Sequence, residues 1–368
     1  MLANNMQNTF QFPEKITIIG GGRWARVMID VLCAVMPQKM FLKIHSIHNS
    51  KFMLEWVKSK VYNHDIEVSD SLPNYSEFKP DAVIVVNAAK DHEMAVEHAL
   101  KAFIPVLVEK PMALNAVSSK RLVDLAFKQN TMFCTSHIFL FANYMEKFIQ
   151  YAKELKNIRN INVVWTDPKS EERYGEQKQF DEGLPIFIDW LPHILSIINS
   201  ISTSNQLFQC KEVDFSKGGA ALKLSLKLGE ISCEIQLERN SYQRKRIVEV
   251  LDVNGEKVQL DFTNEPGNII YNNVEISDSF EWSLENRPVA KTLTSFLKGV
   301  SSDVFDNRLN NIIGLNNSLV IDDILKIYRK CQKAWVNNKL SDIKSFDKDI
   351  YYAITEIIKS DGYFLASK

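Results

Sequence analysis

Short apolar segments alternate with amphipathic helical patterns in the first part of the chain. The apolar segments are residues 15–20, 40–47, 81–87, 106–109 and 131–138, and helical patterns begin near Val27, Lys51, Asp91 and Ala116. Continuous Val, Ile and Leu runs are typical of strands buried on both faces. Strands that alternate with helices favour a parallel, doubly wound sheet with right-handed crossovers. The sequence therefore predicts an N-terminal α/β domain.

The second half of the chain has the pattern of a different sheet. Strand-like segments occur at residues 158–165, 220–228, 231–238, 246–253, 257–262 and 269–276. Polar turns separate most of them, and Asn254-Gly255 and Gly229-Glu230 are hairpin signals. Helical patterns return at residues 288–297 and 316–331. This arrangement predicts an α+β domain with a large, mainly antiparallel open sheet.

A glycine-rich turn follows the first apolar segment. Gly20, Gly22 and Ala25 occupy the small positions of a G-x-G-x-x-A pattern in GGGRWA. The first allows a tight turn, the second lets the backbone approach a pyrophosphate, and the third lets the helix pack closely on the strand. The helix amino terminus then offers unpaired N–H groups to phosphate oxygens. We therefore predict a dinucleotide-binding turn.

The second apolar segment ends without a carboxylate, in His48-Asn49-Ser50-Lys51. An acidic residue there would hydrogen-bond the ribose hydroxyls of NAD and would repel a 2′-phosphate. Ser50 and Lys51 have the chemistry to bind that phosphate, and Arg23 could reach towards it. NADP is therefore favoured over NAD. The alternative is a simple helix start with Asn49 or Ser50 as N-cap and a solvated Lys51.

The fourth apolar segment ends abruptly in Glu109-Lys110-Pro111. In a parallel sheet this position is at the carboxyl edge, where ligands bind. The same edge carries the glycine turn. We therefore treat Lys110 as a candidate functional residue, with a solvated residue at a strand end as the alternative.

Composition narrows the function classes. The chain has 44 Lys and Arg residues and 45 Asp and Glu residues, which gives a net charge of -1. This balance provides no electrostatic basis for binding nucleic acid or an anionic membrane. The five cysteines show no metal-ligand spacing, so we predict no metal site. Residues 1–14 do not resemble a signal peptide, and no apolar run approaches the roughly 18 residues of a membrane helix. A cytoplasmic protein with a small-molecule substrate is expected.

Three segments carry a resemblance to a known family: KITIIGGGRWA, DAVIVVNAAKDHEMAVEHALKAFIPVLVEKP and a later DWLPH. Through them the chain resembles the Gfo/Idh/MocA (glucose-fructose oxidoreductase / inositol dehydrogenase) family, and the similarity extends to about residue 333. The resemblance implies that Lys110 contacts both nicotinamide and substrate and that the Lys110-Pro111 bond is cis. It also implies that Asn87 and His92 line the nicotinamide ribose. The open sheet would mediate a homodimer or homotetramer.

The resemblance divides the chain into an NAD(P)-binding Rossmann domain at residues 1–137 and a substrate and oligomerisation domain at 138–333. Residues 334–368 form a C-terminal extension, for which apolar positions predict a docked helix: Ile350, Ile354, Ile357 and Ile358. The cofactor residues expected in the first domain are Gly20, Gly22, Arg23, Trp24, Ala25, Asn49, Ser50, Lys51, Asn87, His92, Glu109 and Lys110.

The DWLPH segment supplies the other catalytic candidates. If a helix starts near Trp190, Asp189 is its N-cap, Pro192 lies in the first turn and His193 projects from that turn. The family resemblance implies that His193 faces the nicotinamide beside Lys110, with Asp189 as a partner. The alternatives are a structural cap and a satisfied buried histidine.

The chain departs from the family pattern at three positions. Leu191 stands for the family glycine, Ser196 for a frequent acid and Leu140 for a frequent basic residue. The apolar residues around them predict either an unusually apolar pocket or ordinary core: Phe139, Leu140, Phe141, Trp190 and Leu191. The loop at residues 167–183 is the candidate for substrate specificity or, alternatively, a solvated loop; it contains Glu171, Glu172, Arg173, Tyr174 and Lys178.

These features predict an NAD(P)-dependent oxidoreductase acting on a small carbonyl or alcohol, in particular a sugar or polyol derivative. Lys110 is the predicted general acid/base and His193 the rival proton donor. Asp189 would orient the histidine or bind a substrate hydroxyl. Two alternatives stay open: an imine reductase resembling the thiazolinyl imine reductases of secondary metabolism, and a dinucleotide-binding regulator without catalysis.

Overall fold

The computed structural model describes residues 11–173, 176–177, 184–202, 206–278, 283–302 and 304–346. Its first sheet is parallel throughout and has the strand order β3-β2-β1-β4-β5-β6. The strands are β1 (Lys15–Ile19), β2 (Phe41–His45), β3 (Asp65–Ser69), β4 (Ala82–Val85), β5 (Val106–Glu109) and β6 (Phe133–Ser136). This is the strand order of a dinucleotide-binding Rossmann sheet, so the predicted fold of the first part is confirmed.

Helices cover both faces of this sheet because its central strands are apolar on both sides. Every residue of β4 and β5 is buried. The helices that follow the strands are α1 (Arg23–Val35), α2 (Ser50–Lys58), α3 (His92–Lys101) and α4 (Ala116–Lys128). One face, with Val83, Val85 and Val108, packs under α3 and α4 in a cluster of its own. The other face, with Ile16, Ile18 and Ile84, joins a larger core that continues into the second sheet.

The sequence analysis missed β3. Its residues alternate charged and apolar side chains, and none is fully buried. It lies at the edge of the sheet, where Lys39 pairs with Asp65 and Lys43 with Glu67. A five-residue edge strand carries too little apolar character to be recognised without its partner strand.

The second sheet has eight strands in the order β10-β11-β12-β7-β13-β14-β15-β16. They are β7 (Ile158–Pro168), β10 (Phe208–Ser216), β11 (Ala221–Leu228), β12 (Ile231–Ser241), β13 (Lys245–Asp252), β14 (Lys257–Asp261), β15 (Asn268–Tyr271) and β16 (Val274–Glu275). Only the β12–β7 pair is parallel, which confirms a mainly antiparallel sheet. Gly229 and Gly255 have positive φ at the two predicted hairpin turns. A short separate hairpin pairs β8 (Glu172–Arg173) with β9 (Glu176–Gln177).

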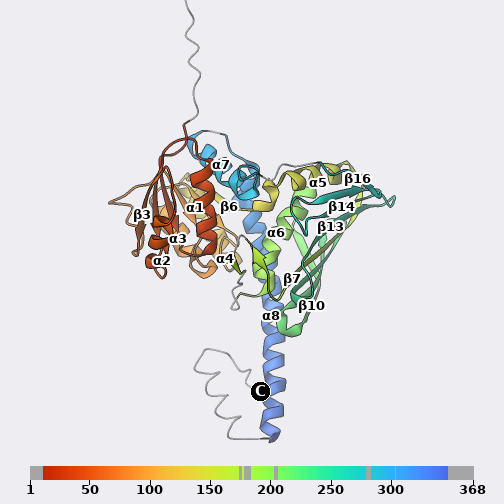
Figure 1. Ribbon diagram of the computed structural model, residues 1–368. Coiled ribbons are helices and arrows are strands. Elements are labelled where there is room, and N and C mark those ends of the chain that lie inside the picture. Colours follow the sequence, from red (N-terminus) through yellow and green to blue (C-terminus); the bar gives the residue numbers. More distant parts are fainter. Residues whose placement is uncertain are drawn as a thin grey trace, which may run out of the picture.

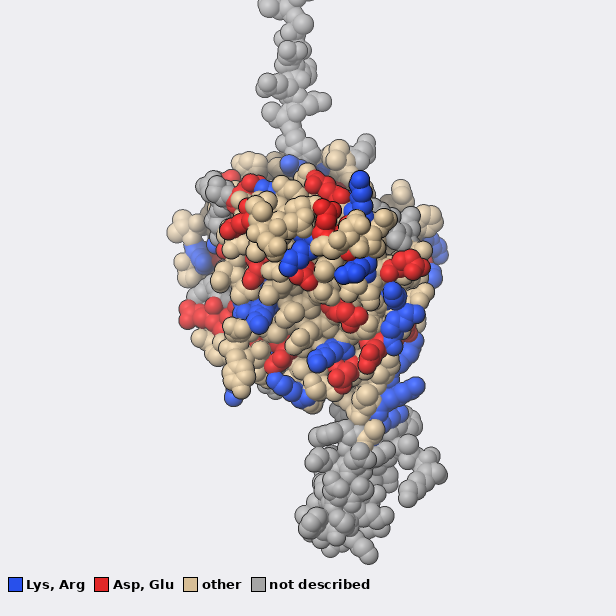
Figure 2. All heavy atoms as spheres, turned by 90° about the vertical axis from the view of Figure 1, so that its right-hand side faces the viewer, with Lys and Arg blue, Asp and Glu red and all other residues tan. Residues whose placement is uncertain are grey.

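The inner face of the large sheet packs on helices α5 (Asn143–Glu154) and α6 (Ile186–Ile201). Alternate residues of β13 are buried, as expected for a sheet with one covered face. Figure 2 shows Lys and Arg interspersed with Asp and Glu on the face of the molecule opposite the first sheet. Neighbouring strands there are joined by polar contacts such as Ser225 Oγ to Glu234 Oε1 at 2.7 Å. Oligomer formation through this face stays a prediction.

Two C-terminal helices tie the two sheets together. Helix α7 (Pro288–Ser301) packs against α1, and α8 (Asn311–Phe346) packs against α4 and α6. Figure 1 shows α8 running between the two sheets and continuing below them. This helix is longer at both ends than the segment predicted from its apolar pattern.

The C-terminal extension is helical as far as it is described, since α8 reaches Phe346. Residues 331–334 are exposed, and Figure 1 shows the last turns of α8 extending away from both sheets. The four isoleucines on which the docked helix was predicted lie outside the described residues.

Candidate functional site

The glycine turn between β1 and α1 is shaped by close packing at one residue and open space at another. Gly20 has φ +147°, and a Cβ there would lie 2.6 Å from the Val86 carbonyl oxygen. A Cβ on Gly22 would meet nothing within 4 Å. Helix α1 begins immediately afterwards at Arg23 and has no acidic residue in its first turn. The turn therefore leaves backbone N–H groups at a helix start accessible to an anion.

The third small residue of the motif has a packing role. Ala25 is fully buried in the core and is not among the residues that line the adjacent cavity. Arg23 and Trp24 do line that cavity. A small residue at position 25 therefore allows α1 to approach the sheet, as the motif predicts.

The segment after β2 lines the same cavity through His45, Ser46, Ile47, His48 and Asn49. None of these residues carries a carboxylate, as the sequence indicated. The buried Ser46 hydroxyl has no protein partner within the described residues.

Two of the predicted phosphate ligands after β2 lie outside the cavity lining. Ser50 starts α2 with Asn49 at the N-cap position, and Lys51 is exposed. Ser50 and Lys51 are not among the lining residues, whereas Arg23 and Asn49 are.

His92 joins the ends of β4 and β5. Its Nδ1 lies 2.7 Å from the Pro111 carbonyl oxygen, and its Nε2 lies 3.2 Å from the Asn87 carbonyl oxygen. The Lys110-Pro111 peptide bond is cis, as the family resemblance implied. Burial lowers the pKa of His92. This histidine therefore fixes the backbone around Lys110, and both His92 and Asn87 line the cavity.

Glu109 is a buried acid that faces several donors. Ser136 Oγ donates to Oε1 at 2.7 Å, and the Lys110 backbone N–H donates to Oε2 at 3.3 Å. The Trp24 side chain also hydrogen-bonds this carboxyl. Burial raises the pKa of Glu109, and these donors only partly offset that effect. Glu109 thereby connects β5, β6 and the start of α1.

Lys110 extends from the end of β5 to α6. Its Nζ donates to Asp189 Oδ1 at 2.6 Å and to the Asp189 carbonyl oxygen at 2.8 Å. The exposed fractions of the two side chains are 16% and 24%, so this ion pair is largely removed from water. Burial would raise the pKa of Asp189, but Lys110 and then Arg239 hold it below its usual value. The predicted convergence of Lys110 and Asp189 is thus present in the geometry.

The predicted start of helix α6 was wrong. Asp189 is not the N-cap, because Pro185 occupies that position and α6 begins at Ile186. Asp189 lies in the first turn, and Pro192 lies inside the helix. The fixed φ of proline suits a helix boundary, and the apolar residues 186–188 already belong to the buried face of the helix. The Asp189 carboxylate consequently accepts from Lys110 and Arg239 side chains.

His193 is buried among aromatic rings. Its imidazole stacks on Trp165 with centroids 6.2 Å apart and meets Phe139 edge-on at 4.9 Å. Its Nδ1 has no protein partner within the described residues. Burial and the nearby Lys110 hold the pKa of His193 well below its usual value. Asp189 affects it through charge, and His193 Nδ1 does not donate a hydrogen bond to the Asp189 carboxylate, so the expected orienting role of Asp189 has no hydrogen bond behind it here.

Three arginines near the end of the large sheet were not identified from the sequence. Arg239 bonds Asp189 Oδ2 at 3.0 Å, and Arg246 pairs with Asp167. Arg244 donates to Glu171 at 3.2 Å. The available signal was the basic cluster ERNSYQRKR at residues 238–246, which spans the end of β12, the turn and the start of β13.

An aromatic and cationic wall results from these contacts. The Arg246 guanidinium lies 4.4 Å from the Trp165 ring centroid and 5.3 Å from that of Trp190, so it lies close to both indoles. Burial lowers the pKa of Arg246 to about 9. Arg244 and Arg246 both line the cavity, as do the two indoles.

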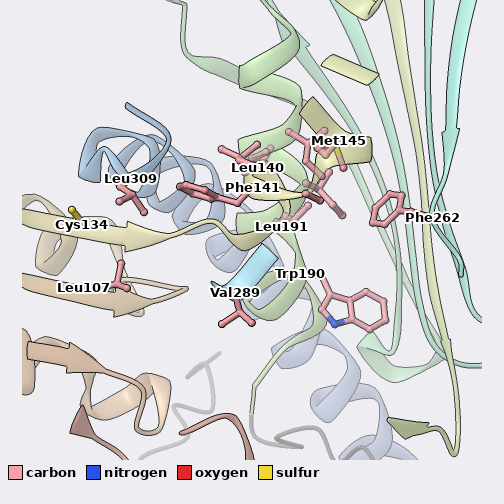
Figure 3. Packing of buried hydrophobic residues seen from close by; sticks show 14 of the residues in the cluster. Leu107, Cys134, Leu140, Phe141, Met145, Trp190, Leu191, Phe262, Val289 and Leu309 are labelled. Atoms are coloured by element: carbon pink, nitrogen blue, oxygen red, sulfur yellow. The ribbon is translucent and has the colours of Figure 1, made fainter. Parts of the chain in front are cut away.

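The predicted apolar pocket is only partly present. Phe139 and Trp190 line the cavity, whereas Leu140, Phe141 and Leu191 are buried in the core. Figure 3 shows these three residues together in the packed interior, apart from the Trp190 indole. For them the alternative interpretation as ordinary core is correct.

The loop at residues 167–183 is described in part. Asp167 and Glu171 pair with the arginines, while Tyr174 and Lys178 lie outside the described residues. Ser196, at the frequent acid position, donates its hydroxyl to the His193 carbonyl oxygen at 2.7 Å.

A single cavity of about 1100 Å³ runs from the glycine turn to the aromatic wall. Lys110, Asp189 and His193 line the same cavity. Within the described residues, no cluster of His, Cys, Asp or Glu side chains is arranged to hold a metal ion. None of the described helices combines the length and apolar character needed to span a bilayer.

Residues 15–137 match a model of the Gfo/Idh/MocA family, described as an oxidoreductase family with an NAD-binding Rossmann fold. No curated protein matches the chain.

Solved structures have a similar fold at low sequence identity. UDP-N-acetylglucosamine 3-dehydrogenase from Acidithiobacillus ferrooxidans has a TM-score of 0.68 at 13% identity, covering 84% of this chain and 96% of that one. A variant of a 3-ketoreductase from Actinomadura kijaniata, in complex with TDP-benzene and NADP, has a TM-score of 0.68 at 14% identity over 84% and 96%. A dehydrogenase from Clostridium difficile has a TM-score of 0.67 at 14% identity over 85% and 99%.

By this match, the N-terminal part of the chain at residues 15–137 is an NAD-binding Rossmann domain of the Gfo/Idh/MocA oxidoreductase family.

Proposed function

We propose that this protein transfers a hydride between nicotinamide C4 and the carbonyl or alcohol carbon of a small sugar or polyol derivative, with Lys110 as general acid/base. The observation that carries the proposal is the contact between Lys110 and Asp189, which both line one cavity. That cavity has a glycine turn at one end and an aromatic wall at the other.

The residues around the glycine turn suit a dinucleotide. Gly22 leaves space for a phosphate, and Arg23 and Asn49 line the adjacent surface. The segment that lines the cavity directly after β2 carries no carboxylate, which supports NADP over NAD. Asn87 and His92 are proposed to line the nicotinamide ribose. Glu109, which lines the same cavity, is proposed to belong to this part of the cofactor site. The bound cofactor would supply or accept the hydride.

Lys110 is suited to proton transfer at the substrate oxygen. An ammonium has three N–H donors, and two of those on Lys110 bond Asp189. The third can reach a substrate oxygen in the cavity. Asp189 limits the freedom of the Lys110 side chain, so the proton is held near the reacting atom.

His193 is the second candidate donor. Its lowered pKa keeps the imidazole neutral near pH 7. A neutral imidazole carries one N–H, so His193 can hydrogen-bond a substrate hydroxyl or relay a proton without bearing charge itself.

The names of similar proteins support a sugar-like substrate. One acts on UDP-N-acetylglucosamine, another is a 3-ketoreductase, and a third is a putative myo-inositol dehydrogenase from Sinorhizobium meliloti. The rings of Phe139, Trp165 and Trp190 offer apolar surface against which a sugar ring can pack.

A second candidate is reduction of a cyclic imine. The same aromatic wall would accommodate a planar heterocycle. The support from Leu140 and Leu191 is lost, because both residues belong to the core. A regulator without catalysis is disfavoured by the paired Lys110 and Asp189 in the cavity.

The test is a screen of the purified protein for NADPH and NADH oxidation with ketosugars and cyclic imines, and for reduction of the oxidised cofactors with polyols. The proposal expects turnover with a ketosugar or polyol. Turnover with cyclic imines alone would favour the second candidate, and tight cofactor binding without any turnover would favour the regulator.

A further inference from the structure

Arg239 lies directly behind the Lys110–Asp189 pair. It extends from β12, and its side chain is only 8% exposed. One Nη donates to Asp189 Oδ2 at 3.0 Å, and the other donates to the Leu184 carbonyl oxygen at 2.9 Å. The Asp189 carboxylate is therefore held between two cations, with Lys110 on Oδ1 and Arg239 on Oδ2.

This arrangement fixes the carboxylate in two directions. A carboxylate held by one flexible lysine can rotate about its terminal torsion, because such sp³–sp² torsions are broad. A second donor on the other oxygen removes that freedom. The planar guanidinium is itself held by the Leu184 carbonyl and lies 5.7 Å from the Trp190 ring centroid.

The contact with Leu184 links two parts of the site. Leu184 lies next to the C-terminal end of the 167–183 loop and lines the cavity. One guanidinium thus joins the aspartate that holds Lys110 to the segment from which substrate specificity is expected.

We propose that Arg239 is a positioning residue: it aligns the Asp189 carboxylate so that Lys110 is held at the reacting oxygen of the substrate. The proposal rests on the proposed function of Lys110. Arg239 acts through Asp189, and it is assigned no contact with substrate or cofactor.

The test compares Arg239→Met and Arg239→Lys with Arg159→Met as a matched control. Arg159 is exposed near the start of β7, at the opposite end of the large sheet. With the substrate found in the screen, Arg239→Met is expected to lower kcat by about 100-fold, the scale of a displaced catalytic group. Affinity for NADPH, measured by fluorescence titration, should stay close to the wild-type value. Arg239→Lys should recover part of kcat, and the control should match wild type.

A double variant distinguishes positioning from a separate role. If Arg239 acts through Asp189, Asp189→Asn combined with Arg239→Met should lower kcat no further than the more damaging single change. Multiplicative losses, or a folded Arg239→Met protein with wild-type kcat, would overturn the proposal.

A crystal structure of Arg239→Met tests the positioning of Asp189 without an activity assay. The proposal predicts that Asp189 Oδ1 and Lys110 Nζ separate beyond hydrogen-bonding distance or that Asp189 occupies several rotamers. An unchanged Lys110–Asp189 contact would contradict it. Absence of wild-type turnover would contradict the proposed function instead, and would leave this structural result to decide whether Arg239 aligns the pair. If Arg239→Met does not fold, kcat and the crystal structure are determined for Arg239→Lys instead.

Discussion

Lys110 and Asp189 are 79 positions apart in the sequence and form an ion pair with Nζ and Oδ1 at 2.6 Å. The contact joins the end of a parallel strand to the first turn of a helix in the second half of the chain. A buried pair is costly to break because removal of one partner leaves an uncompensated charge. Its position within the cavity therefore points to a role in chemistry as well as in structure.

The two outer glycines of the turn should respond differently to substitution. Gly20→Ala places a Cβ 2.6 Å from the Val86 oxygen on a backbone with φ +147°, so we expect a loss of about 1–3 kcal/mol in unfolding free energy. Gly22→Val finds open space at an ordinary φ, so the fold should keep its stability. Its side chain should instead obstruct the phosphate and weaken NADPH binding by about tenfold or more.

Thermal unfolding and NADPH titration of both glycine variants provide the measurement. Equal losses of stability in the two proteins would show that the turn has no open side. Unchanged NADPH affinity in Gly22→Val would place the phosphates elsewhere.

Cofactor preference should depend on Arg23 more than on Lys51. Arg23 lines the cavity, whereas Lys51 is exposed and lies outside the lining set. We expect Arg23→Met to weaken NADPH binding by about tenfold, the scale of a charge-assisted hydrogen bond, with a smaller effect on NADH. Lys51→Met should change neither affinity appreciably. Isothermal titration with both cofactors checks this, and the reverse ranking would restore Lys51 as the phosphate ligand.

The sequence predicted the parallel sheet, the glycine turn and the carboxyl-edge position of Lys110 because each depends on local pattern. Apolar runs identify buried strands, and a small-residue spacing identifies the turn. The approach of Asp189 to Lys110 was inferred only through the family resemblance.

The buried arginines, the cavity lining and the start of α6 depend on contacts between residues distant in sequence, which no local pattern encodes. Arg239 and Arg246 look like ordinary charged residues of an exposed hairpin, yet each is buried by neighbours distant in sequence. Leu140, Leu191 and Phe139 are all apolar, so the sequence does not separate them. In the structure Phe139 lines the cavity, whereas Leu140 and Leu191 are buried in the core. The start of α6 at Ile186 was missed because Asp189 has the chemistry of an N-cap, while its actual partners come from β5 and β12.

Acid should destabilise the protein partly through His137. Burial lowers the pKa of His137 to about 3, and neither ring nitrogen has a protein partner within the described residues. Below about pH 6.5 the unfolded chain binds a proton that the folded protein does not. Stability from this group is therefore complete above that pH and decreases as pH falls towards the folded-state pKa, by about 2 kcal/mol at pH 5.

Denaturant unfolding of wild type and His137→Leu between pH 7 and pH 5 measures this effect. The variant should lose less stability over that interval, whatever its absolute stability at pH 7. An unchanged slope in His137→Leu would show that this histidine is accessible to protons in the folded state.

The most direct test of the central claim is turnover of Lys110→Met beside Lys128→Met, an exposed substitution of the same kind on α4. Met retains much of the length of the lysine side chain and removes the transferable proton. The account predicts a fall in kcat of about 100-fold or more, the usual contribution of a general acid/base, with NADPH affinity nearly unchanged and with wild-type turnover in Lys128→Met. Wild-type turnover in a folded Lys110→Met protein would contradict it.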